Sequence, residues 1–121
     1  MEKVNLNAKL KSVEDNLDIN TVGVINKNKI IYQEDNINVT ILIFDNKIEV
    51  NRTCNEYKIK LIFEKNNHTV STYNVFGAPK VFSLDLFTTK LNIDDKRIEI
   101  EYILGENKFY YCLNIGGKYD N

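Results

Sequence analysis

The feature that most constrains this chain is a two-residue alternation of apolar and polar side chains, interrupted at short intervals by polar turns. It appears first near the N-terminus, where Val4, Leu6, Ala8 and Leu10 alternate with lysine and asparagine. Successive side chains of a β-strand point to opposite faces, so this spacing gives a strand one apolar and one solvated face. A helix cannot gather these residues on one face, and the alternation therefore predicts an all-β protein.

The alternation returns along the chain, and clusters of Asn, Asp, Lys and Gly separate the alternating segments. These residue types favour turns because they tolerate positive φ or hydrogen-bond their own backbone. The pattern predicts about ten strands. They are expected over residues 3–13, 17–25, 29–33, 37–44, 47–53, 57–64, 68–75, 80–91, 96–104 and 108–115.

The connections between these segments are short, roughly two to five residues, and this length decides the topology. A parallel crossover needs about a dozen residues, so the strands must pair with antiparallel neighbours. An open sheet of this width leaves two long edges that are liable to aggregate, and closure removes them. We therefore expect a single domain over residues 1–121, an antiparallel up-and-down meander of about 8–10 strands closing into a β-barrel.

Charge and hydropathy exclude some classes of partner. The chain has 16 Lys and Arg against 17 Asp and Glu, a formal net charge of -1 and a pI near 5.8. A general nucleic-acid binder carries a concentrated positive field, which this balance does not supply. Apolar runs are far shorter than the roughly 20 residues that span a bilayer, and no export signal is visible. We expect a cytoplasmic protein with no nucleic-acid and no membrane partner.

The residues that carry chemistry do not converge on a catalytic or metal site. Ser71 and Ser83 lie in strand-like contexts without a nucleophile elbow, and His68 has no carboxylate close to it in sequence. Glu99 and Glu101 share the polar face of a strand, where carboxylates are normally solvated. We therefore expect no enzyme, no catalytic residue and no cofactor.

The cysteines point the same way. Cys54 and Cys112 are far apart in the sequence, and the chain holds a single histidine, His68. A zinc site needs closely spaced Cys and His ligands, which these positions do not provide. We expect free thiols, one in a loop and one in a strand, and no metal.

One expected strand is apolar on both of its faces. Val39, Ile41 and Ile43 lie on one side, and Leu42 and Phe44 lie on the other. A strand that is apolar on both faces is typically covered on both. We expect the outer side to be covered by the N-terminal strand or by a second subunit.

Aromatic residues concentrate toward the C-terminus of a chain that holds seven Tyr and six Phe. They either fill the core or line a partly open barrel mouth, where tyrosine hydroxyls would supply polar contacts to a small ligand. The candidate pocket residues on the inward phase are Leu61, Phe63, Tyr102, Leu104, Phe109 and Tyr111, with Tyr73 and Phe76 near the rim.

Three stretches of the C-terminal half carry a resemblance to a known family. They are the run 72–77 with a Tyr before an aromatic–Gly pair, the Thr-bearing run 86–91 ending in Leu, and the alternating run 98–104. With them the chain resembles, over about residues 5–115, the uncharacterised bacterial β-barrel family typified by YwiB. The resemblance implies a small lipocalin-like, or calycin-like, barrel in a family with no assigned activity.

Two functions remain open at this point. The first is a non-enzymatic barrel that binds a small apolar or amphipathic ligand, based on the meander and the aromatic C-terminal strands. The second is a filled barrel acting as a protein interaction module or a homodimer through the strand around Leu42 and Phe44. An enzyme comes third, because no acid, base and nucleophile set converges.

Overall fold

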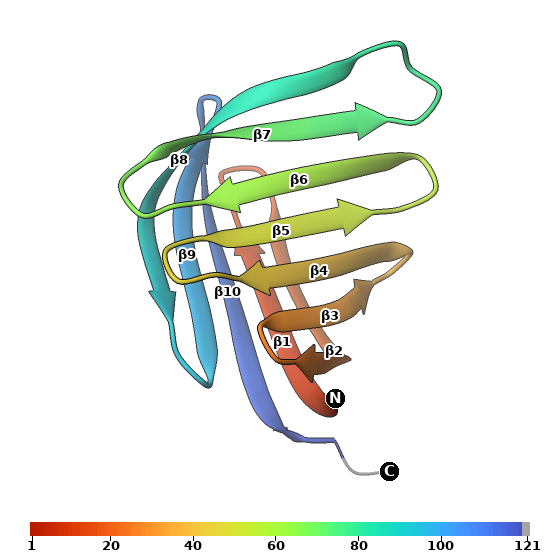
Figure 1. The fold of residues 1–121 in the computed structure, drawn as a ribbon, viewed down its shortest axis with the longest axis vertical. Helices are drawn as coiled ribbons and strands as arrows, with labels where there is room; N and C mark the ends of the chain where they lie inside the picture. The colour runs from red at the N-terminus through yellow and green to blue at the C-terminus, as the bar shows by residue number, and fades with distance from the viewer. Residues whose placement is uncertain (120–121) are drawn as a thin grey trace.

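Each strand pairs with its neighbours in the chain, and the last strand pairs with the first. The computed structural model describes residues 1–119 and forms a closed barrel of antiparallel strands (Figure 1). The strands are β1 (Glu2–Lys11), β2 (Asn16–Asn26), β3 (Lys29–Glu34), β4 (Ile37–Ile43), β5 (Ile48–Thr53), β6 (Tyr57–Phe63), β7 (His68–Val75), β8 (Val81–Ile93), β9 (Arg97–Leu104) and β10 (Asn107–Lys118).

This architecture confirms the predicted all-β meander and its closure. Strand β1 pairs with β2 on one side and with β10 on the other, which closes the wall. Ten strands are present within residues 1–119, close to the ranges expected from the alternation, with β10 extending furthest beyond its expected end. No helix of this part of the chain is long and apolar enough to cross a membrane.

Two-residue turns account for several of the tight hairpins. Between β2 and β3, Asn26 pairs with Lys29, and Lys27 in the turn has a φ of 57°. Between β9 and β10, Leu104 pairs with Asn107 across a turn that begins at Gly105. A positive φ at the first turn residue gives the backbone twist that matches the twist of the flanking strands. Short polar turns therefore hold the consecutive strands antiparallel and in register.

The two ends of the barrel differ. We call the mouth the end that carries the β1–β2, β3–β4, β5–β6, β7–β8 and β9–β10 turns. The opposite end, where β1 begins and β10 ends, we call the termini end. There the backbone N–H of Tyr119 donates to the carbonyl of Lys3 over 2.9 Å, and Val4 near the start of β1 pairs with Lys118 at the end of β10, so these two strand ends lie side by side (Figure 1). Large, fully buried side chains extend along the barrel. Val4, Ile48 and Ile98 lie toward the termini end, while Val39, which pairs with Arg52, and Leu86, which pairs with Leu104, lie toward the mouth.

Of the two covers expected over the outer side of β4, the N-terminal strand and a second subunit, the structure excludes the first. Strand β1 lies in the barrel wall between β2 and β10, so it does not cover β4, and that expectation is wrong. On the outer face Leu42 is half-buried between its cross-strand partners Lys29 and Glu49. Phe44 follows the end of β4, is 43% exposed, and carries the ammonium group of Lys47 at 5.1 Å from its ring centre. A second subunit on this face stays a prediction.

Replacing Gly23 with alanine is expected to lower the free energy of unfolding by about 1–3 kcal/mol, because overpacking a filled interior forces neighbours apart. Gly23 is buried in β2, and an added Cβ would lie 2.3 Å from Leu6 Cδ1 and 2.8 Å from the Ile31 carbonyl oxygen. Urea unfolding measures the loss. Gly117→Ala is the matched control, since a Cβ there meets nothing within 4 Å. Equal stability of the two variants would contradict the prediction.

Candidate functional site

A cavity of about 100 Å³ lies inside the barrel below the mouth. Its apolar wall includes Leu10, Leu17, Val50, Leu61 and Phe63. Leu10 and Leu17 face each other across the β1–β2 hairpin close to its turn, which places the cavity near the mouth. A water molecule takes about 30 Å³ in the liquid, so this volume suits about three waters or the polar head of a small ligand.

A charged pair faces the same cavity from two strands. Arg52 near the end of β5 donates through Nη2 to Oε1 of Glu34, the last residue of β3, over 2.7 Å. The two side chains are 18% and 9% exposed. Burial lowers the pKa of Arg52, but the hydrogen bond and the charge of Glu34 outweigh burial and raise it. A charge inside a barrel is tolerated when it is paired in this way.

Three tyrosines complete the polar part of the interior. The hydroxyls of Tyr32 on β3 and Tyr111 on β10 lie 2.7 Å apart, joining two strands that β2 and β1 separate in the wall. Burial raises the pKa of both phenols. Burial also raises the pKa of Tyr102 to about 12, against the opposing charge of Arg52, and no hydrogen bond within residues 1–119 contributes to that shift. Tyr102 thus brings a hydroxyl with unused hydrogen-bonding capacity to the cavity wall.

Alkaline pH is expected to destabilise the fold through Tyr102. The pKa of Tyr102 in the folded state, about 12, lies above the usual 10.0. Tyr102 therefore makes its full contribution to the free energy of unfolding below pH 10, and this contribution is lost as the pH rises toward 12. Tyr102 alone then contributes a loss of about 2 kcal/mol by pH 12. Urea unfolding at several alkaline pH values measures the slope. Tyr102→Phe should show a shallower slope, and an unchanged slope would refute the assignment.

Arg52 sits in one continuous row of inward-facing residues that crosses the barrel wall. Direct cross-strand partners connect Tyr32, Val39, Arg52, Ile59, Tyr73 and Phe82, from β3 to β8. Neighbouring strands lie about 4.8 Å apart, so Phe82 lies about 14 Å along the wall from Arg52. The ring centre of Tyr73 lies 5.6 Å from that of Tyr57 and 6.4 Å from that of Phe82. An apolar and aromatic track therefore leads away from the charged pair.

The far end of this track is exposed because the β7–β8 hairpin extends past its neighbour. Phe82 and Leu84 are 53% and 47% exposed, although they share a face with the fully buried Leu86. Pairing between β8 and β9 begins only at Leu86, one residue after the Gly105 N–H donates to the Asp85 carbonyl. Figure 1 shows this hairpin reaching away from the β9–β10 turn. We call the inner face formed by Tyr73, Phe82 and Leu84 the flap.

The structure distributes the eight sequence candidates over three places. Four of them line the cavity, namely Leu61, Phe63, Tyr102 and Tyr111. Tyr73 lies on the flap, and Phe76 is 48% exposed in the turn at its tip, both at the mouth. Leu104 and Phe109 pack against the core, with Phe109 stacked on Tyr102 at 5.2 Å between ring centres. The candidates therefore cluster around the mouth, but they do not form one pocket.

Sequence reasoning missed the charged pair, although the alternation contained its signal. Arg52 follows Ile48 and Val50 at the two-residue spacing of the inward face. Glu34 follows Ile30 and Tyr32 in the same way. Extending each apolar series by one more step would have placed both charges inside the barrel.

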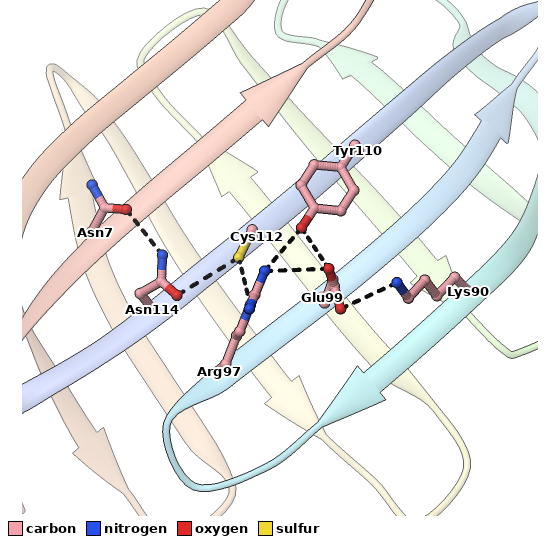
Figure 2. A network of polar contacts seen from close by, with 7 residues as sticks. All are labelled: Asn7, Lys90, Arg97, Glu99, Tyr110, Cys112 and Asn114. Atoms are coloured by element: carbon pink, nitrogen blue, oxygen red, sulfur yellow. Dashed lines mark hydrogen bonds and ion pairs between the residues drawn. The ribbon is translucent and has the colours of Figure 1, made fainter.

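A polar network lies on the outer, solvent-facing side of β9 and β10, away from the cavity (Figure 2). Tyr110 Oη donates to Glu99 Oε2 over 2.6 Å, and Arg97 Nη2 donates to the same oxygen over 3.3 Å. Lys90 Nζ lies 3.4 Å from Glu99 Oε1, and Arg97 Nε donates to Cys112 Sγ over 3.2 Å. The network therefore links β8, β9 and β10 on the solvent side of the wall.

Hydrogen bonds within this network shift the pKa values of two of its residues. The hydrogen bond from Tyr110 is the main cause that lowers the pKa of Glu99, and the same bond raises the pKa of Tyr110 to about 12. Further along, Asn114 Nδ2 donates to Asn7 Oδ1 over 3.1 Å, which extends the contacts to β1. The polar groups are hydrogen-bonded to one another, so we interpret the network as a structural one that stabilises the pairing of neighbouring strands.

Two further sequence candidates, Ser71 and Cys112, are buried, whereas His68 is exposed on the outer side of the wall. His68 on β7 gains a partner that the sequence did not reveal, Asp85 of β8, with Nδ1 2.9 Å from Oδ2. Both side chains are more than 60% exposed. Cys54 and Cys112 are both free thiols, as predicted. Within residues 1–119, no group of three or more His, Cys, Asp and Glu is placed to hold a metal ion.

The fold and the cavity together define a class: within residues 1–119, a small, closed, antiparallel ten-stranded β-barrel with a mostly apolar cavity that holds one ion pair near its mouth. Residues 3–118 match the family described as Domain of unknown function (DUF1934), and the chain belongs to that family. The crystal structure of the ywiB protein from Bacillus subtilis is similar in fold. It has a TM-score of 0.65 and 14% sequence identity, over 95% of this chain and 89% of that chain. No curated protein matches this chain.

Proposed function

We propose that this protein is a non-enzymatic, lipocalin-like barrel that binds a small amphipathic ligand at its mouth. The observation that carries the proposal is a single row of inward-facing residues that reaches from the interior cavity to the exposed flap. Arg52 lines the cavity and stands in the same cross-strand row as Phe82. Ligand sites combine an apolar surface with a few placed polar groups, which is the composition found here.

The size of the cavity supports an amphipathic ligand over a wholly enclosed one. Enclosed ligand sites have volumes of about 300–1,000 Å³, well above the roughly 100 Å³ available beside Arg52. Only part of a ligand fits inside, and the rest would lie on the flap, where Phe82 and Leu84 are already exposed to water. Covering these side chains removes apolar surface from solvent and so favours binding.

A fluorescence titration tests the proposal. N-phenyl-1-naphthylamine, a neutral apolar dye that brightens in apolar surroundings, is expected to bind the purified protein with a saturable signal. Leu84→Ser removes an apolar side chain from the flap and should weaken dye binding several-fold. Val70→Ser is the matched control, because Val70 is 60% exposed on the other face of the same hairpin. Absence of a saturable signal, or equal weakening by both variants, would count against a ligand site at the mouth.

The alternative from the sequence, a homodimer or interaction module through the strand around Leu42 and Phe44, stays a second proposal. The 43% exposed ring of Phe44 supports it, while the charged neighbours Lys29 and Glu49 interrupt the apolar surface around Leu42. Native mass spectrometry counts the subunits directly. A dimer that Leu42→Glu dissociates would favour this alternative, and a monomer would exclude the homodimer.

A further inference from the structure

The polar head of the ligand is constrained by the pair of charges that it must meet. Arg52 and Glu34 neutralise each other at 2.7 Å, in a cavity whose other walls are mostly apolar. An anionic head would compete with Glu34 for Arg52 and bring two carboxylates together. A cationic head would compete with Arg52 for Glu34 and bring two positive charges together. Either would leave a charge in the interior without a full partner, which is costly.

The hydrogen-bonding capacity at the pair is mixed and partly unused. A guanidinium carries several N–H donors, and Arg52 uses Nη2 to reach Glu34 Oε1. Within residues 1–119, the other carboxylate oxygen of Glu34 accepts no side-chain hydrogen bond. The Tyr102 hydroxyl at the same cavity can donate or accept. The site therefore offers donors and acceptors side by side around a neutralised ion pair. Lys9, the other charged residue at the cavity, alternates with the inward-facing Ala8 and Leu10 and so belongs to the outer phase of β1.

We propose that the ligand presents an uncharged head that both donates and accepts hydrogen bonds, of the carboxamide or alcohol type, beside the intact Arg52–Glu34 pair. This inference rests on the proposed function and adds the chemistry of the head. The head and its first carbons occupy the cavity of about 100 Å³. The tail follows the row through Ile59 and Tyr73 to Phe82, a path of about 14 Å along the wall.

Competition among four ligands with the same eight-carbon chain tests this inference. Octanamide and octanol, kept below the concentrations at which they self-associate, are expected to displace N-phenyl-1-naphthylamine at neutral pH. Octanoate and octylammonium should displace it at least about tenfold more weakly. Equal or tighter binding of a charged ligand would overturn the neutral head and leave the proposed function standing. If the dye itself does not bind, the proposed function fails instead.

A pair of double variants locates the head. Arg52→Met with Glu34→Leu removes the charged pair and is expected to weaken octanamide binding about tenfold. Arg97→Met with Glu99→Leu removes the arginine–glutamate pair of the outer wall and should leave octanamide binding unchanged. Equal affinity for octanamide in both double variants would place the head elsewhere. Should the first variant fail to fold, the four-ligand series on the unaltered protein still decides the charge of the head.

Discussion

Replacing Glu34 with leucine is expected to lower the free energy of unfolding by about 3 kcal/mol, since removing one partner of a buried ion pair leaves the other charge uncompensated. Glu34 is 8% exposed, and it accepts the hydrogen bond of Arg52 at 2.7 Å inside the barrel. Chemical unfolding of the wild type and the variant measures the loss.

The double variant Glu34→Leu with Arg52→Met should recover stability to within about 1 kcal/mol of the wild type, because apolar residues can replace a buried pair. Glu49→Leu is the control on the outer wall, where Glu49 Oε1 lies 3.9 Å from Lys60 Nζ. An outer pair of this kind contributes less than about 1 kcal/mol. If Glu34→Leu lowers the free energy of unfolding no more than Glu49→Leu does, the interior pair does not behave as a buried ion pair.

Replacing Phe63 with alanine is expected to cost about 4 kcal/mol, the range for deleting a buried aromatic side chain. Phe63 is 2% exposed, and its ring meets that of Tyr102 edge to face at 4.8 Å between centres. Unfolding in urea measures the cost. Phe44→Ala is the control, because Phe44 is 43% exposed and surface replacements usually change stability by about 0.5 kcal/mol or less.

The same variant has a second readout. Phe63 lines the cavity of about 100 Å³, so its removal enlarges a mostly apolar space. Apolar cavities of about 150 Å³ accommodate benzene. Benzene is therefore expected to raise the Tm of Phe63→Ala and to leave that of the wild type nearly unchanged. A Tm that benzene shifts equally in both proteins would show that the enlarged space does not form.

Half of the candidate pocket residues that the sequence predicted do line the cavity. Leu61, Phe63, Tyr102 and Tyr111 were assigned inward by alternation, and all line the cavity. Leu104, assigned the same phase, packs against the core instead. Leu104 differs from these four residues in its position along the barrel and in the side chains that lie across the interior from it. A period of two reports the face of the wall and contains no information about what lies across the interior.

The local sequence determined the strands, their antiparallel order and the inward face of each, because alternation and turn chemistry act over a few residues. Only the tertiary structure decided which residues meet across the barrel. Glu34 reaches Arg52 because the register of β3, β4 and β5 brings their mouth ends together. Tyr32 reaches Tyr111, 79 positions away, because closure of the wall sets that distance. The exposure of Phe82 likewise arises from the point at which β8 leaves β9, which depends on the stagger of the strands.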